Sequence, residues 1–338
     1  MAPHFRIGVD LGGTKIEAVV VELGGDGKPN AAGTDATKAA GPPSLGRARV
    51  ATNRTLGYEH VVETTRALVF EVAKQAGIDP LATPIGVGMP GSVTRLRADG
   101  TRSELDLVKN SNTTCLNGRP FHADLVKAVG RPIVFANDAN CFALAEATWG
   151  AARGARVAFG VIMGTGVGGG IVTTNAAGIP RAWNGAQGIA GEWGHVVHDP
   201  DNGPACYCGK RGCIETYLSG PAIEAEYARR TGTNRNLAEI AARARPKPMG
   251  TSESEEDANA RVLISERVEV FGRALSIVIN VLDPDVIVLG GGVSNLAVLY
   301  DEGACAVTRW IFNDEVKTKI VKHALGDSAG VLGAALLP

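Results

Sequence analysis

The sequence lacks an excess of charge of either sign, since 34 lysines and arginines face 35 acidic residues and leave a formal net charge of −1. Nucleic acids and anionic membrane surfaces attract basic proteins, so we expect neither as a partner. Long apolar runs are missing too: the longest runs, such as residues 286–289, are too short to cross a bilayer. No signal peptide is recognisable ahead of the first strand, and a cytoplasmic protein is therefore expected.

Cysteine is scarce, with six residues, yet Cys206, Cys208 and Cys213 fall within eight positions. In a reducing compartment such a trio indicates a metal site rather than disulfides. With His195 it offers one nitrogen and three thiolates, the ligand set of a closed, structural zinc site that takes no part in chemistry. His198 is an equally near alternative to His195, and three free thiols beside a chance histidine are the other interpretation.

The length and composition predict a two-domain globular protein. A chain of 338 residues exceeds what one hydrophobic core usually holds. Hydrophobic residues make up 45% and charged residues 20%, which is typical of globular enzymes and excludes a disordered chain. Glycine is abundant, with 44 residues, and its clusters between apolar runs suggest turns where the backbone approaches a ligand.

The pattern of strands and helices predicts an α/β protein built from a repeated unit. A strand, a glycine turn and a second strand occur at residues 5–23 and recur at 157–174, with the second turn expected at 164–170. Residues 24–57 have no clear period, and residues 246–257 are expected to form a surface loop. Helices are expected at 61–76, 137–149, 256–282 and 330–337, and further strands at 85–89, 133–136 and 286–289.

The first glycine turn, Asp10-Leu-Gly-Gly-Thr-Lys15, has the composition of a phosphate loop without the P-loop pattern. Backbone N–H groups of Gly12 and Gly13 can face phosphate oxygens, with Thr14 as a further donor and Lys15 as counter-charge. Asp10, at the end of a strand, is placed to orient a Mg²⁺ ion through water. A plain type I′ hairpin is the alternative.

Two further glycine segments would complete a nucleotide site. Their candidate residues are Gly164, Thr165, Gly166 and Gly168 in the second turn, and Gly290, Gly291 and Gly292 after the strand at 286–289. Ser294 follows as an expected helix N-cap.

Acidic residues stand at positions suited to catalysis. Asn137 and Asp138 lie where a strand ends and a helix begins, the usual location of active-site groups in α/β folds. Asp138 can accept the proton of a hydroxyl that attacks a γ-phosphate, or it is simply an N-cap. Glu192 and Glu215 flank the cysteines and either present carboxylates to polyol hydroxyls or are ordinary surface acids.

The chain as a whole resembles the ROK family (repressors, open reading frames and kinases). The most specific motif is Gly191-Glu-x-Gly-His195 followed by Cys206-x-Cys-Gly-x-x-Gly-Cys213-x-Glu215. DLGGTK at 10–15, GMPG at 88–91, NDAN at 137–140 and LDPDVIVLGGG at 282–292 follow in the family's order. The resemblance runs from Arg6 to the C-terminus.

This resemblance implies an actin-like, hexokinase-type ATPase fold with two similar domains around a cleft. Residues 1–136 plus about 326–338 would form a small N-terminal domain, and residues 137–325 a large one with the zinc motif at 195–213. A homodimer is expected. A repressor of the family would need a helix-turn-helix domain ahead of the first strand, and with five residues before Arg6 we expect an enzyme.

The resemblance also implies the roles of the site residues. Asp138 would be the catalytic base, and the turns at 12–15 and 164–166 would hold the phosphates of Mg-ATP. His195 would bind zinc through one ring nitrogen and a sugar hydroxyl through the other. The hexose would contact Gly88, Pro90, Gly91, Asn112, Asn137, Asp138, Glu192, His195 and Glu215.

Residues 109–121 discriminate most strongly within the family. They resemble ROK fructokinases that also accept mannose, apart from Cys115, where an aromatic residue is more usual. We therefore expect ATP-dependent conversion of fructose to fructose 6-phosphate. N-acetylglucosamine kinase and glucokinase are the alternatives within the family, and a catalytically inactive sugar-binding protein is the alternative outside the enzymes.

Overall fold

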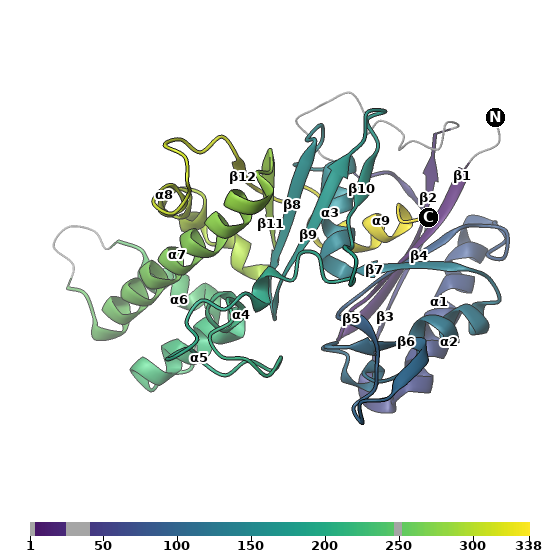
Figure 1. Cartoon of the computed structure of the whole chain (residues 1–338), viewed down its shortest axis with the longest axis horizontal. Helices are drawn as coiled ribbons and strands as arrows, with labels where there is room; N and C mark the ends of the chain where they lie inside the picture. Colours follow the sequence, from purple (N-terminus) through teal and green to yellow (C-terminus); the bar gives the residue numbers. More distant parts are fainter. Residues whose placement is uncertain (1–3, 25–40, 247–251) are drawn as a thin grey trace. The chain divides into compact units, whose positions relative to one another are not determined.

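The computed structural model describes residues 4–24, 41–246 and 252–338 (Figure 1). Strands and helices alternate along much of this length, as expected of an α/β protein. The strands are β1 (His4–Leu11), β2 (Lys15–Leu23), β3 (Ser44–Ala51), β4 (Ile85–Met89), β5 (Ser92–Leu96), β6 (Arg102–Lys109), β7 (Ile133–Asn137), β8 (Val157–Met163), β9 (Val167–Thr174), β10 (Pro180–Ala182), β11 (Val286–Gly290) and β12 (Lys319–Lys322). The α-helices are α1 (Tyr58–Ala76), α2 (Phe121–Val129), α3 (Asp138–Thr148), α4 (Glu215–Leu218), α5 (Gly220–Thr231), α6 (Leu237–Ala244), α7 (Glu255–Leu282), α8 (Glu302–Thr308) and α9 (Ala329–Ala335).

The first sheet has the strand order β3-β2-β1-β4-β7. β1 and β2 form an antiparallel hairpin, whereas β4 runs parallel to β1 and β7 runs parallel to β4. In this register Asp10 lies opposite Gly88, and Met89 lies opposite Asn137. Because the carboxyl ends of parallel strands meet at one edge, the segments that follow β1, β4 and β7 leave the sheet side by side.

Helices cover both faces of this sheet. Successive side chains of a strand point to opposite faces. Ile7 and Val9 are buried in one hydrophobic core with Val61 of α1, and Gly8 between them faces α9. A Cβ on Gly8 would lie 2.2 Å from the carbonyl oxygen of Val331, so glycine lets α9 pack directly on the strand.

The second sheet has the order β10-β9-β8-β11-β12. β9 and β10 are antiparallel, and β11 and β12 are parallel. β11 is buried at every residue, as a parallel strand covered on both faces should be. The long helix α7 packs against α8, α6 and α5. None of the helices in the described residues has the length and apolar character needed to span a bilayer.

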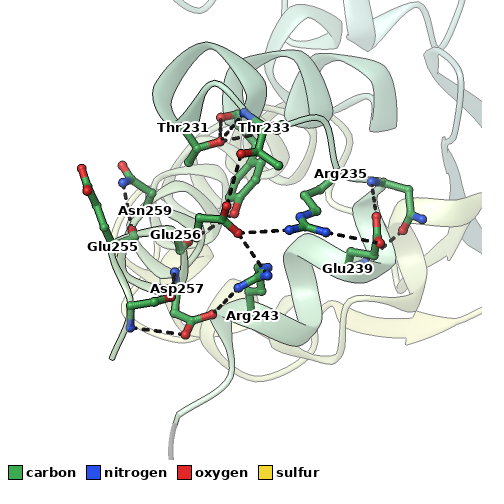
Figure 2. A network of polar contacts seen from close by, with 12 residues as sticks. Thr231, Thr233, Arg235, Glu239, Arg243, Glu255, Glu256, Asp257 and Asn259 are labelled. Atoms are coloured by element: carbon green, nitrogen blue, oxygen red, sulfur yellow. Dashed lines mark hydrogen bonds and ion pairs between the residues drawn. The ribbon is translucent and has the colours of Figure 1, made fainter. Parts of the chain in front are cut away.

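A network of charged side chains joins α6 to the start of α7 (Figure 2). Glu256 accepts contacts from Arg235 at 3.3 Å and from Arg243 at 3.0 Å, and Arg243 also pairs with the buried Asp257 at 3.0 Å. Ser254 and Asp257 form a reciprocal capping box, which fixes the first turn of α7. The loop expected at 246–257 therefore ends as a helix cap, and its residues 247–251 lie outside the described residues.

The second glycine turn is shorter than expected. β9 begins at Val167, so the turn spans residues 164–166 and Gly168 to Gly170 belong to the strand. Gly170 serves packing, because a Cβ there would lie 2.3 Å from the carbonyl oxygen of Ala139 in α3. The sequence suggested a turn because glycine is also what a strand needs where another backbone approaches closely.

Two other local expectations were wrong. Residues 24–57 were given no strand, but Ser44–Ala51 forms β3, an edge strand exposed at most positions and therefore without apolar alternation; residues 25–40 lie outside the described residues. Ser294 is not an N-cap, since it lies within the 3₁₀ turn Gly292–Asn295 and its hydroxyl donates to the carbonyl of Gly291 at 2.7 Å.

The chain divides into two compact units. The first contains Met1–Gly160, Gly170–Gly191 and His323–Pro338, and the second Val161–Gly169 and Glu192–Lys322. α3 belongs to the first unit because it packs on α9: a Cβ on Gly333 would lie 1.7 Å from the carbonyl oxygen of Cys141. The boundaries expected after residues 136 and 325 differ from this division, and which parts behave as domains stays a prediction.

Candidate active site and metal centre

One edge of the first sheet gathers three of the predicted site segments. Asp10 is the second-last residue of β1, Gly91 follows β4, and Asn137 ends β7. The side-chain amide of Asn137 donates to the carbonyl of Gly91 at 3.2 Å, and its oxygen accepts from the N–H of Ala139 at 2.9 Å. Asn137 is therefore the N-cap of α3. The same side chain also ties the segment after β4 to the start of α3.

Asp138 is the first residue of α3 and not its cap. One carboxylate oxygen accepts from the N–H of Ala139 at 2.8 Å, while desolvation by the surrounding atoms raises the pKa of the side chain. Burial, followed by the charge of Asp138, also raises the pKa of Asp10, to about 7. Two neighbouring carboxylates that resist ionisation are characteristic of sites for acid–base chemistry.

The turn after β1 is not the type I′ hairpin that the sequence left open. That turn needs positive φ at both central residues, and neither Gly12 nor Gly13 has it. Gly12 donates to the carbonyl of Lys15 at 2.9 Å. Thr52, the residue after β3, also holds the turn, because its hydroxyl donates to the carbonyl of Gly12 at 2.7 Å. The turn is a three-residue loop with a fixed shape, as a phosphate-binding backbone requires.

The segment at 109–121 reaches the same turn. A Cβ on Gly13 would lie 3.3 Å from the side-chain oxygen of Asn112. The segment also packs closely on Gly91, which has φ 90°. A Cβ on Gly91 would lie 2.6 Å from the carbonyl oxygen of Lys109, so only glycine allows this approach. The Asn117 side chain ties the loop by accepting from the N–H of Ser111 at 2.9 Å and donating to its carbonyl at 3.0 Å.

A cavity of about 130 Å³ opens beside these residues. Its lining includes two predicted sugar contacts, Gly91 and Asn137, together with His122 and Phe135. The His122 ring stacks on Phe135 with centroids 3.9 Å apart, and burial lowers the pKa of His122 to about 4, so the ring is neutral. Neither aromatic ring is predictable from the sequence, because no local motif marks them.

The second unit carries the zinc candidate. The donor atoms of His195, Cys206, Cys208 and Cys213 all lie within 4.8 Å of one another. Cys206 Sγ is 3.6 Å from His195 Nδ1, and Cys208 Sγ is 3.6 Å from Cys213 Sγ. A tetrahedral zinc site with Zn–S bonds of about 2.3 Å places its sulfurs about 3.8 Å apart, so these residues fit the ion.

The same geometry favours His195 over His198 as the fourth ligand. The ring of His198 packs instead against that of Tyr217, with centroids 5.2 Å apart. His195 Nε2, which the family resemblance assigns to a sugar hydroxyl, lies 3.0 Å from the Tyr207 hydroxyl. Tyr207 was missed as a site residue although it stands between two of the cysteines.

Predicted sugar and nucleotide residues meet within the second unit. Burial, followed by the charges of Glu215 and Glu192, raises the pKa of Tyr207. One oxygen of Glu215 accepts from the N–H of Val167, at the end of the 164–166 turn. Gly291 approaches the same region, since a Cβ there would lie 2.3 Å from the carbonyl of Met163.

Gly168 is placed differently from its prediction. It lies in β9, and its carbonyl accepts from the indole of Trp193 at 2.9 Å, which ties the strand to the 3₁₀ turn Trp193–His195. The predicted residues are thus shared between the units. The first holds Asp10, Gly12, Gly13, Thr14, Lys15, Gly88, Pro90, Gly91, Asn112, Asn137 and Asp138, and the second holds the others.

Comparison with known proteins gives one consistent result. The model of the ROK family matches residues 6–338. N-acetyl-D-glucosamine kinase of Vibrio cholerae serotype O1 is 32% identical over 302 residues, covering 86% of this chain and 92% of the relative, and that of Vibrio vulnificus is 34% identical over 306 residues, covering 86% and 91%.

Solved structures match over nearly the whole chain. A ROK hexokinase from Thermus thermophilus is similar with a TM-score of 0.74 and 30% identity, covering 98% of this chain and 97% of that one. A ROK glucokinase from Streptomyces griseus, solved with glucose and AMPPNP, has a TM-score of 0.68 and 28% identity, with 98% of both chains covered.

Proposed function

The chain belongs to the ROK family and has its hexokinase-type α/β fold, and we propose that it transfers the γ-phosphate of ATP to the 6-hydroxyl of a hexose, with fructose as the favoured acceptor. Its relatives are sugar kinases that it matches over about nine-tenths of their length, so the chain is a sugar kinase. The proposal adds the sugar and the residue roles. Its main support is the pair of carboxylates, Asp10 and Asp138, beside the glycine turn.

Asp138 would act as the general base. As the sugar oxygen attacks the γ-phosphorus, its proton passes to the Asp138 carboxylate, and the bond from the γ-phosphorus to the bridging oxygen of ADP breaks. A carboxylate with a raised pKa holds that proton better than an ordinary aspartate does. Asn137 would position the base by capping α3.

The glycine turn would bind the phosphates through backbone N–H groups, with Lys15 as counter-charge. Mg²⁺ arrives with ATP as part of the substrate, and Asp10 is the carboxylate available to orient it. In the second unit, the turn at 164–166 and the loop at 290–292 would hold the remainder of the nucleotide.

Zinc, when bound by His195 and the three cysteines, supplies structural cross-linking and no open coordination position. Its ligands all lie within the segment between Glu192 and Glu215, the two proposed sugar contacts. Holding this segment in one conformation would keep both carboxylates ready for the sugar hydroxyls.

Fructose and N-acetylglucosamine are the two substrates to separate. Residues 109–121 resemble fructokinases, whereas the Vibrio relatives are N-acetylglucosamine kinases. We keep N-acetylglucosamine as the second candidate and glucose as the third.

The test is a coupled assay of ADP release with fructose, mannose, glucose and N-acetylglucosamine. The expected result is the highest kcat/KM for fructose, with mannose next. A higher kcat/KM for N-acetylglucosamine would overturn the choice of sugar but not the kinase. Absence of ADP release with all four hexoses, from protein that binds ATP, would overturn both.

A further inference from the structure

Arg54 lies beside the first glycine turn, close to Gly13. Thr52 is bound to the turn twice, through its hydroxyl and through its N–H, which donates to the carbonyl of Thr14 at 2.9 Å. The next residue, Asn53, has φ 46°, a conformation that non-glycine residues seldom adopt. This left-handed residue turns the chain so that Arg54 begins a 3₁₀ turn directly beside Gly13.

The guanidinium of Arg54 lies between the glycine turn and the loop of residues 110–117. Its Nη1 donates to the carbonyl of Asn112 at 2.6 Å and lies 3.5 Å from the position of a Cβ on Gly13. A long, exposed side chain is thus fixed by one short hydrogen bond. An arginine has five N–H donors, so most of its donors remain free to bind a ligand.

The charge of Arg54 has no carboxylate partner among the described residues, since no acidic group there lies within ion-pair distance of it. The neighbouring cations differ: Arg47, Arg49 and Lys15 all contact the buried carboxylate of Glu17, with Arg49 at 2.6 Å and Lys15 at 4.0 Å. Arg54 therefore presents an uncompensated positive charge where backbone N–H groups already favour an anion.

We propose that Arg54 binds the phosphoryl group in transfer, at a site for a phosphate anion that it forms with Gly13. The inference rests on the proposed function, since the same group is the γ-phosphate of ATP before transfer and the 6-phosphate of the sugar afterwards. A guanidinium group can donate hydrogen bonds to two phosphate oxygens at once. These hydrogen bonds become stronger as negative charge builds up on the oxygens during the transfer. Its bond to Asn112 joins this anion site to the loop that carries a predicted sugar contact.

A purely structural role makes a different prediction. If Arg54 only braced the 110–117 loop, its loss would misplace Asn112 and raise the KM for the sugar while leaving phosphate binding unchanged. Phosphate binding instead predicts a lower kcat, weaker binding of the phosphorylated product, and little change in the KM for the sugar.

The experiment compares Arg54→Ala and Arg54→Lys with Arg66→Ala as the matched control. Arg66 is half-buried on α1 and paired with Glu63 at 2.9 Å. For Arg54→Ala we expect kcat about 10²-fold lower, as for loss of one donor to a transition-state anion, and inhibition by fructose 6-phosphate weakened about 10-fold or more. Added guanidinium ion should restore part of kcat in Arg54→Ala, and Arg54→Lys should retain an intermediate rate.

Further measurements distinguish ATP from the sugar phosphate as the ligand of Arg54, and distinguish failure of this inference from failure of the proposed function. Binding of AMPPNP and of fructose 6-phosphate, measured by calorimetry, shows whether Arg54 acts before or after transfer. If the wild-type protein phosphorylates no hexose, the proposed function fails, and binding of inorganic tripolyphosphate to wild type and Arg54→Ala still tests the anion site. Unchanged phosphate binding and kcat with a raised sugar KM would overturn the inference.

Discussion

Glu215 Oε2 accepts a hydrogen bond from the backbone N–H of Val167 at 2.8 Å. Glu215 is a predicted sugar contact that follows the last cysteine of the metal cluster, and Val167 directly follows the glycine turn predicted to hold ATP. This bond ties the two functions together inside one compact unit. It also gives a physical path by which loss of metal can affect nucleotide binding.

Gly166→Ala tests this connection. A Cβ at that position would lie 2.7 Å from Glu215 Oε2, so the carboxylate must move or the bond to Val167 must break. We expect the KM values for both the sugar and ATP to rise, by about 10-fold if one charge-assisted hydrogen bond is lost. Steady-state kinetics check this, with Ala176→Gly in an exposed loop as the control. A rise in the ATP KM alone would show that Glu215 does not bind the sugar.

Asp138→Asn should lower kcat by about 10²- to 10⁴-fold, because the amide cannot accept the proton. Folding should be unaffected, since Asn137 and not Asp138 caps α3. Asp106→Asn, at an exposed carboxylate paired with Arg95, is the control and should keep full activity. Near-normal kcat in a folded Asp138→Asn enzyme would remove Asp138 from catalysis.

The raised pKa of Asp138 has a consequence for the pH profile. The base must be ionised, so kcat should begin to fall at a higher pH than an ordinary aspartate would cause. Rate measurements with fructose at saturating ATP from pH 3.5 to 8 check this. A rate that falls only around the pKa of an ordinary aspartate, about 3.9, contradicts it.

Asp10 should make the folded protein less stable as pH rises. Its pKa is raised from 3.8 to about 7, so the folded state holds a proton that the unfolded chain has already released. Stability should fall between about pH 4 and pH 7 and then level off, by up to about 4 kcal/mol from this group. Asp10→Asn should remove that part of the slope. The change in stability is measured as the difference between the thermal midpoints at pH 5 and pH 7.5, without magnesium or nucleotide. The same difference in the wild-type protein and in Asp10→Asn would refute the prediction.

The metal cluster should hold one zinc per chain. Cys208→Ala and His195→Ala should lose the metal, melt at a lower temperature and raise the sugar KM, with a smaller rise in the ATP KM transmitted through Glu215. His198→Ala is the control and should keep its zinc. The zinc content of the purified proteins, measured by elemental analysis, decides whether His195 or His198 is the fourth ligand. Wild-type protein without stoichiometric metal, or a Cys208→Ala enzyme with unchanged melting and sugar KM, would contradict the assignment.

The sequence predicted the regular elements best where periodicity was strong. The helix expected at 256–282 is α7, Glu255–Leu282, and the buried run at 286–289 lies within β11. β3 escaped detection because its exposed arginines pair with Glu17 of the neighbouring strand, and such a partner is invisible before the sheet forms.

The candidate site divides in the same way. Cys206, Cys208 and Cys213 are close in the chain, so residue type and spacing alone indicated a metal site. Strand order and register bring Asp10 close to Asp138. They also bring Arg54 into contact with Asn112, although these two residues are 58 positions apart in the chain.

By itself the sequence determined which chemical groups are available, where strands and helices form, and the α/β class, because these depend on residue type and near neighbours. Only the tertiary structure decided that His195 rather than His198 faces the thiolates, that Asn137 rather than Asp138 caps α3, and that Arg54 stands at the glycine turn. The physical reason is that burial, charge pairing and hydrogen-bond partners arise between segments far apart in the chain, and only packing brings these together.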